Sequence, residues 1–103
     1  MSAEEIRVDD VSTEIEVTVT RKGLVMDLTS AAVKQFIFKK PNANSTITKD
    51  VGFVTDGTDG VLIYRTEEGF LDTPGTWKLQ VYLEIGAWKG RSTVVSFEVH
   101  RNL

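Results

Sequence analysis

The 103-residue sequence predicts a single all-β domain, a sandwich of about seven short strands. Apolar and polar residues alternate along several segments, which is the period of a strand with one buried face. Clusters of glycine, proline, asparagine and aspartate separate these segments at intervals of roughly ten residues. No window of about twelve residues carries apolar side chains at helical spacing.

The strands differ in how strongly the pattern defines them. In the first, three apolar residues alternate with glutamate and threonine, which describes a half-buried strand. The hydroxyls of Thr29 and Ser30 favour a bend after the second strand. The third is apolar on both faces, as in a central strand, and its register is therefore the least determined. The strands are expected at residues 14–20, 24–28, 31–40, 47–54, 61–65, 77–85 and 88–100.

Turn residues occupy the connections. Residues 21–23 close the first strand, and residues 41–44 contain proline, which fixes φ, and asparagine, which tolerates the left-handed region. Residues 56–60 form a polar loop rich in aspartate and glycine. Residues 67–75 are a connection with a buried anchor at Phe70 or Leu71.

The C-terminal hairpin is the most regular unit of the sequence. Gly86 and Ala87 separate two extended runs, and glycine at the first central position suits a type II′ turn. Gly90 is expected to mark a bulge or irregularity near the start of the returning strand. The core-facing residues of the hairpin are expected to be Trp77, Leu79, Val81, Leu83, Ile85, Val95, Phe97 and Val99.

Composition narrows the class of protein. The chain has no cysteine, so a disulfide or a thiolate metal site is impossible. It lacks an apolar run of the roughly 20 residues that span a bilayer, so no membrane association is expected. The acidic start does not resemble a signal peptide, and we expect the mature protein to begin here. A net charge of -3 has the wrong sign for binding nucleic acid.

Groups suited to catalysis are sparse. His100 is the only histidine and is interpreted as a solvated residue at a strand end. Asp56 and Asp59 could approach a cation, but the spacing of a calcium loop is missing and a polar turn explains them better. The acidic pairs 9–10 and 67–68 are interpreted as solvated loop charges. We therefore expect no catalytic, metal or cofactor-binding residue, no small-molecule substrate, and a protein that is not an enzyme.

Several residues are candidates for binding another protein. Trp88 lies beside Lys89 and Arg91, and an aromatic residue next to cations is typical of interface anchors; cross-strand packing is the alternative. Tyr82 projects among polar neighbours on the outward face of its strand, where a partner could dock.

The N-terminal residues 1–11 are interpreted as an arm, distinct from a domain at residues 12–103. This arm is too polar to join the core, yet it contains Ile6 and Val8, so it can add a strand to the open sheet edge of a neighbouring molecule. The alternative is a disordered tail.

A set of short motifs has a familiar order. It comprises Gly23, Met26-Asp27-Leu28-Thr29, Phe36-Ile37-Phe38-Lys39-Lys40-Pro41-Asn42, Gly60-Val61-Leu62-Ile63-Tyr64, Pro74-Gly75-Thr76-Trp77-Lys78 and Phe97-Glu98-Val99. Over about residues 12–100 the chain thereby resembles the N-terminal domain of bacteriophage baseplate upper proteins. The resemblance implies an immunoglobulin-like antiparallel β-sandwich that holds a receptor-binding apparatus on the tail baseplate.

Two departures from the family pattern modify this expectation. Asn42-Ala43 stands where the family usually has Asp-Gly, which changes the turn. Family members continue into coiled-coil and fibre regions, whereas this chain ends at Leu103. We therefore expect a free-standing module that bridges or decorates other subunits, and not an adaptor that carries a fibre covalently.

The sequence thus predicts a non-enzymatic structural component of a tailed phage particle, a protein-binding adaptor of the tail or baseplate. It would be located in the virion after synthesis in the cytoplasm of the bacterial host, with other virion proteins as partners and homo-oligomers possible. A capsid decoration protein is one alternative. A carbohydrate-binding sandwich is another, and it requires Trp88, Tyr82 and Tyr64 to form one exposed platform. An enzyme dependent on His100 or Asp59 ranks third.

Overall fold

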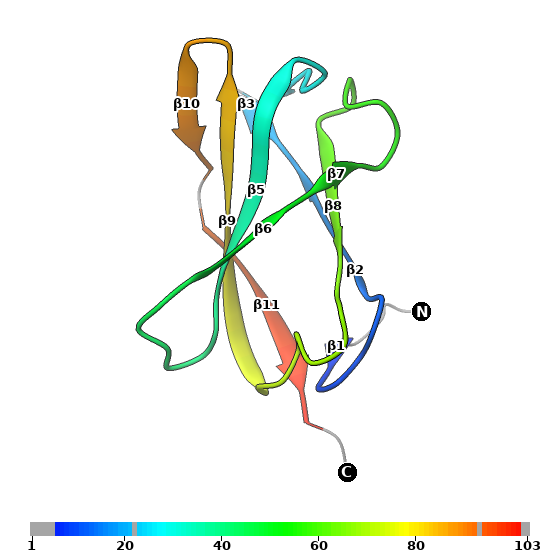
Figure 1. Cartoon of the computed structure of the whole chain (residues 1–103), viewed down its shortest axis with the longest axis vertical. Coiled ribbons are helices and arrows are strands. Elements are labelled where there is room, and N and C mark those ends of the chain that lie inside the picture. Colours follow the sequence, from blue (N-terminus) through cyan, green and yellow to red (C-terminus); the bar gives the residue numbers. More distant parts are fainter. Residues whose placement is uncertain (1–5, 22, 93, 102–103) are drawn as a thin grey trace.

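The computed structural model describes residues 6–21, 23–92 and 94–101. Its strands form two principal sheets that face each other, as Figure 1 shows. No helix occurs among the described residues, and so none that could cross a membrane is found there. The predicted all-β sandwich is confirmed.

The larger sheet contains six strands. They are β1 (Ile6–Arg7), β5 (Ala31–Lys39), β6 (Ile47–Asp50), β9 (Gly75–Ile85), β10 (Trp88–Arg91) and β11 (Val95–His100). Their order across the sheet is β1-β11-β9-β5-β6, and β10 also pairs with β9. Every pairing is antiparallel except that of β1 with β11, which is parallel.

The smaller sheet has the order β2-β8-β7, and a separate hairpin continues from its first strand. Its members are β2 (Glu14–Thr18), β8 (Val61–Arg65) and β7 (Gly52–Phe53), and the hairpin consists of β3 (Thr20–Arg21) and β4 (Leu24–Val25). Consecutive strands repeatedly cross between the two sheets, which is compatible with the immunoglobulin-like arrangement expected from the resemblance.

The structure has eleven strands where about seven were expected, because three predicted strands are each divided in two and the predicted arm contributes β1. The clearest case is residues 47–54. Here β6 pairs with β5 in the larger sheet, and β7 pairs with β8 in the smaller one. The change of sheet occurs at buried Val51, and the green run in Figure 1 crosses the molecule there. This one segment therefore links both layers.

The C-terminal hairpin has the predicted turn. Ile85 pairs with Trp88, Gly86 has a φ of 60°, and Ala87 is not among the residues with positive φ, as a type II′ turn requires. The predicted bulge at Gly90 is wrong, because this residue pairs regularly with Leu83.

The irregularity lies further along the returning strand. Arg91 pairs with Tyr82 whereas Val95 pairs with Leu79, so the register between the strands shifts by one residue between these two pairs. At Gly90, a Cβ atom would lie 2.3 Å from the Trp88 ring. The indole of Trp88 therefore packs closely over Gly90, and this position is not a bulge.

The core consists of the inward side chains of both sheets. In β9, Trp77, Leu79, Val81 and Leu83 are all nearly inaccessible, as the alternation predicted. Phe70 and Leu71, the two proposed anchors of the 67–75 connection, are both buried. The other buried inward residues are Ile15, Val19, Leu28, Phe36, Phe38, Leu62, Tyr64 and Val99. Val95 was expected in the core but is 43% exposed, because it lies at the open side between the two sheets.

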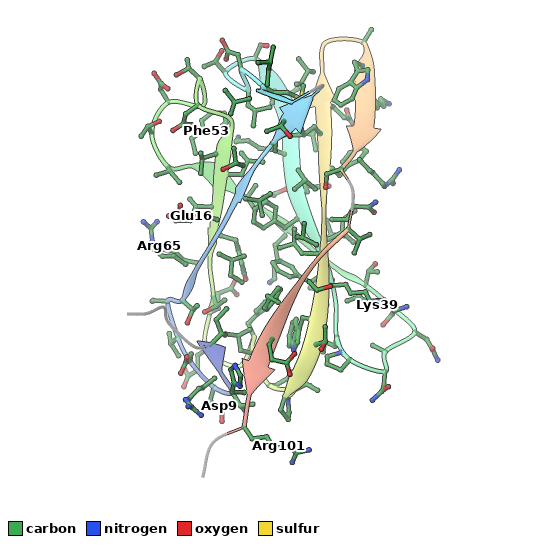
Figure 2. All side chains as sticks on the ribbon, turned by 180° about the vertical axis from the view of Figure 1, so that it is seen from behind. Asp9, Glu16, Lys39, Phe53, Arg65 and Arg101 are labelled. Atoms are coloured by element: carbon green, nitrogen blue, oxygen red, sulfur yellow. The ribbon has the colours of Figure 1, made fainter. Side chains whose placement is uncertain are left out.

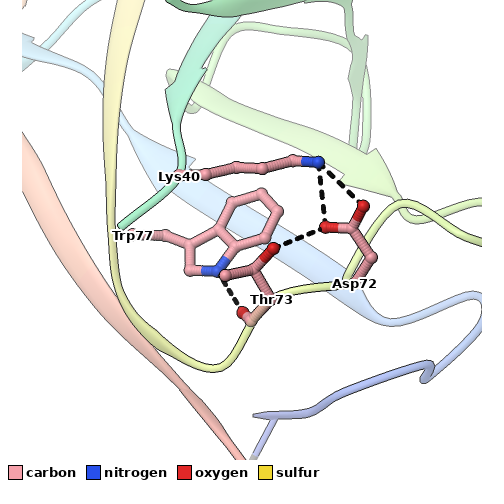
Figure 3. Close-up of polar contacts among 4 residues, drawn as sticks. All are labelled: Lys40, Asp72, Thr73 and Trp77. Carbon is pink, nitrogen blue, oxygen red and sulfur yellow. Dashed lines mark hydrogen bonds and ion pairs between the residues drawn. The ribbon is translucent and has the colours of Figure 1, made fainter. Parts of the chain in front are cut away.

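Trp77 is the largest fully buried side chain, and polar contacts fix its orientation. Its indole Nε1 donates a hydrogen bond to the Thr73 carbonyl at 2.8 Å (Figure 3). Asp72 accepts hydrogen bonds from the Thr73 hydroxyl and from Lys40, whose Nζ lies 5.9 Å from the Trp77 ring centroid. The connection before β9 is thus tied to the end of β5.

The N-terminal arm belongs to the same structure as the sandwich from Ile6 onward. Ile6 pairs with Val99 of β11, the Val8 amide donates to the His100 carbonyl at 3.0 Å, and both apolar side chains pack against the core. The expectation that the arm stays outside the core is therefore wrong for this stretch, because β1 completes its own sheet. Residues 1–5 lie outside the described residues.

Tyr64 contributes a buried phenol with one polar partner. Its hydroxyl donates a hydrogen bond to Glu67 Oε1 at 2.6 Å, and only 7% of the residue is exposed. Burial raises the pKa of Tyr64 above its ordinary value near 10, and the hydrogen bond to Glu67 and the negative charge of Glu67 raise it further. The same contact, followed by the charge of Lys49, lowers the pKa of Glu67.

We expect stability to fall at alkaline pH partly because of Tyr64. The folded state holds the phenolic proton more tightly than the unfolded chain does, so this contribution is complete below the ordinary pKa near 10. It is lost as the pH rises through and beyond that value. Urea unfolding from pH 8 to about 11 should show a shallower decline for Tyr64→Phe than for the wild type. The hydrogen bond to Glu84 also raises the pKa of Tyr82, but Tyr82 is less buried, so Tyr82→Phe should change the decline less than Tyr64→Phe does. Parallel declines of wild type and Tyr64→Phe would contradict the assignment.

Candidate protein-binding surfaces

Three of the predicted binding residues lie together on the outer face of the β9–β10 hairpin. Arg91 pairs with Tyr82, and Lys89 pairs with Glu84. The guanidinium carbon of Arg91 lies 4.9 Å from the centroid of the Tyr82 ring. The Tyr82 hydroxyl donates to Glu84 Oε2 at 2.5 Å, and this bond raises the pKa of Tyr82. We call Tyr82, Glu84, Lys89 and Arg91 the hairpin cluster.

Trp88 points to the other face of the same hairpin. It pairs with Ile85, so its side chain lies on the side of buried Leu83, and 39% of it is exposed. With Val19 and Met26 it lines a cleft of about 220 Å³ at the open side between the sheets. The sequence grouped Trp88 with Lys89 and Arg91, whereas strand alternation separates it from both.

The residues considered for strand addition to a neighbour and for a glycan-binding platform do not lie where these roles require them. Ile6 and Val8 are partly buried against the core of their own domain. Tyr64 is 7% exposed, and Trp88 and Tyr82 lie on opposite faces of the hairpin. The three aromatic residues therefore do not form the single platform that the carbohydrate-binding alternative requires.

The 56–60 loop uses its carboxylates to shape its own backbone. Asp56 Oδ1 accepts hydrogen bonds from the Thr58 amide at 3.0 Å and hydroxyl at 2.7 Å, and these bonds lower the pKa of Asp56. Asp59 accepts from the Val61 amide and the Thr55 hydroxyl. Across the part of the chain that the structure describes, no three His, Asp or Glu residues converge as metal ligands would.

The structure also brings together two residues that the sequence analysis did not select. Lys39 of β5 pairs with Lys78 of β9, and both are exposed. They flank inward-facing residues, so strand alternation places both side chains on the outer face of the larger sheet. Each is an ordinary polar position in an alternating strand, and only the register between the two strands reveals that they are neighbours.

Comparison with known protein families identifies the family of the chain. The model of the BppU N-terminal domain matches residues 3–103. The chain belongs to this family. A search of curated proteins found no match. Members of this family are structural components associated with the phage baseplate, and they are generally non-enzymatic. The chain is therefore a phage structural protein of the virion, and its partners are other virion proteins.

Proposed function

We propose that the chain is a non-enzymatic adaptor of the phage tail or baseplate, and that it docks another virion protein through the outer face of its larger sheet. The observation that carries this proposal is the hairpin cluster. Tyrosine and arginine are enriched among residues that dominate binding energy, and here they stand side by side on an accessible face.

The internal contacts of the cluster favour binding because they restrict its side chains before a partner arrives. Arg91 lies over the Tyr82 ring, and Tyr82 is held by Glu84. Less conformational entropy is then lost on association. A mixed cluster of one carboxylate, two cations and an aromatic ring suits a polar protein surface better than a glycan, which would need an open aromatic platform.

We expect the double variant Tyr82→Ala/Arg91→Ala to bind its particle at least about thirtyfold more weakly, since truncation of a binding hot spot costs on the order of 2 kcal/mol or more. Binding of the labelled chain to phage particles that lack it would be measured by co-sedimentation. The control is Arg65→Ala, which removes an exposed cation from β8 in the smaller sheet.

Cryo-electron microscopy of the reconstituted particle would show where the chain is bound. Density at the tail or baseplate, with the hairpin cluster against a neighbouring subunit, is the expected result. Density on the capsid would replace the adaptor with the decoration function. Unchanged binding of Tyr82→Ala/Arg91→Ala would remove the hairpin cluster from the interface.

A further inference from the structure

The outer face of the larger sheet carries a second feature, a pair of neighbouring lysines that form no ion pair within the described part of the chain. Lys39 and Lys78 are directly opposite on neighbouring antiparallel strands. Cβ atoms at such positions lie about 4.5–5.5 Å apart, and like charges there are destabilising. The chain keeps this unfavourable pair although its net charge is -3.

Neither lysine forms an ion pair with any of the described residues. Glu98 accepts from the Thr76 hydroxyl at 2.8 Å, and Asp50 accepts from the Gln35 amide at 3.1 Å. The described residues form the ion pairs Lys40–Asp72, Lys49–Glu67 and Arg65–Glu14. All three involve cations other than Lys39 and Lys78.

The two lysines also lie where two hollows of the surface meet. One hollow, of about 160 Å³, is polar and includes Asn42 and Thr76. The other, of about 260 Å³, has the apolar residues Ile37, Leu79 and Val94 in its lining. Both include Lys39 and Lys78. Figure 2 shows Lys39 at the periphery of the molecule, on the opposite side from Glu16 and Arg65.

We propose that these hollows bind an acidic segment of a protein partner, with a carboxylate between Lys39 and Lys78 and an adjacent apolar side chain against Ile37 and Val94. The inference rests on the proposed docking function and specifies the chemistry of the partner. A carboxylate at this position would remove the repulsion within the pair and form two charge-assisted contacts. The partner segment should therefore combine Glu or Asp with valine, isoleucine or leucine.

An acidic protein segment explains the site better than a nucleic acid does. Affinity for a phosphate backbone grows with the number of phosphates that a row of cations neutralises. Here two lysines are adjacent, and an apolar hollow adjoins them. That combination fits a short peptide segment with one charge and one apolar side chain.

The test uses the full-length ¹⁵N-labelled chain and a decapeptide of alternating glutamate and valine as the probe. We expect the peptide to shift the amide resonances of residues 37–40 and 76–80, and to bind more weakly as salt is added. Lys39→Gln/Lys78→Gln should reduce affinity at least about tenfold, as should a peptide with glutamine in place of glutamate. The matched control Arg65→Gln, on the other sheet, should bind as the wild type does.

Thermal unfolding checks that the double variant is folded. Because Lys39→Gln/Lys78→Gln removes repulsion between like charges, its Tm should equal or slightly exceed that of the wild type. Unchanged peptide affinity of this variant would overturn the inference, as would resonance shifts confined to another surface. Tighter binding to a DNA duplex than to the peptide would assign the lysines to phosphate instead.

Binding to particles that lack the chain separates this inference from the proposed function. If the wild type does not bind them at all, the docking function itself fails. If the wild type binds and Lys39→Gln/Lys78→Gln binds equally well, only the acidic partner is excluded. If the double variant binds at least about tenfold more weakly, both proposals are supported.

Discussion

Replacing Trp77 with alanine is expected to lower the free energy of unfolding by about 3–5 kcal/mol, the largest effect of any single core substitution in this domain. The indole is fully buried, and its ring lies 5.5 Å from Phe70 and 5.9 Å from Phe97, centroid to centroid. Truncation would leave a cavity between the sheets and would remove the hydrogen bond to the Thr73 carbonyl. Domains of this size are typically stable by only about 5–15 kcal/mol, so much of the folded-state stability would be lost.

Equilibrium unfolding in urea measures this loss, and Trp88→Ala is the matched control. Trp88 is 39% exposed and borders a cleft, so its truncation should cost clearly less than that of fully buried Trp77. Trp77→Phe should fall between the two, because it keeps most of the apolar volume but leaves the Thr73 carbonyl without its donor. Equal losses for the two alanine variants would contradict the assignment of Trp77 to the core.

Replacing Gly60 with alanine is expected to cost about 2–4 kcal/mol, because two separate penalties combine at this position. Gly60 has a φ of 72°, a left-handed conformation that residues with a side chain disfavour. An added Cβ would also lie 2.8 Å from the Met26 carbonyl oxygen and 2.9 Å from that of Val19. Both oxygens belong to the backbone, and the Gly60 carbonyl accepts a hydrogen bond from the Val19 amide, so these backbone segments would have to move apart.

Gly69→Ala isolates the conformational part of that cost. Gly69 has a similar φ of 82°, but an added Cβ there would have no atom within 4 Å. Its substitution should cost only about 1–2 kcal/mol. Urea unfolding of both variants gives the difference, and equal values would show that the contacts of Gly60 with the Met26 and Val19 carbonyls contribute nothing.

The local features of the fold followed from the sequence wherever one periodicity dominated. Alternation along residues 77–85 predicted which side chains of β9 are buried, and glycine at residue 86 predicted the turn. These features depend on neighbours in the chain, since period-two burial and positive φ are local properties. The family resemblance added what the pattern could not, and the match over residues 3–103 confirmed it.

The proposed binding surface was harder to predict from the sequence. Proximity along the chain grouped Trp88 with Lys89 and Arg91, but alternation places Trp88 on the opposite face. Lys39 and Lys78 gave no signal at all, because they are 39 positions apart and become neighbours only through the pairing of β5 with β9.

The sequence by itself therefore determined the all-β class, the terminal hairpin and the family, because each is encoded in residues close together or in their order. Only the tertiary structure decided that Ile6 pairs with Val99, that one run changes sheets at Val51, and that the two lysines share a hollow. The physical reason is that strand pairing joins distant segments through backbone hydrogen bonds, which are the same for every residue type except proline. Which strand lies beside which is then set by how the whole set of apolar faces packs, and no single segment carries that information.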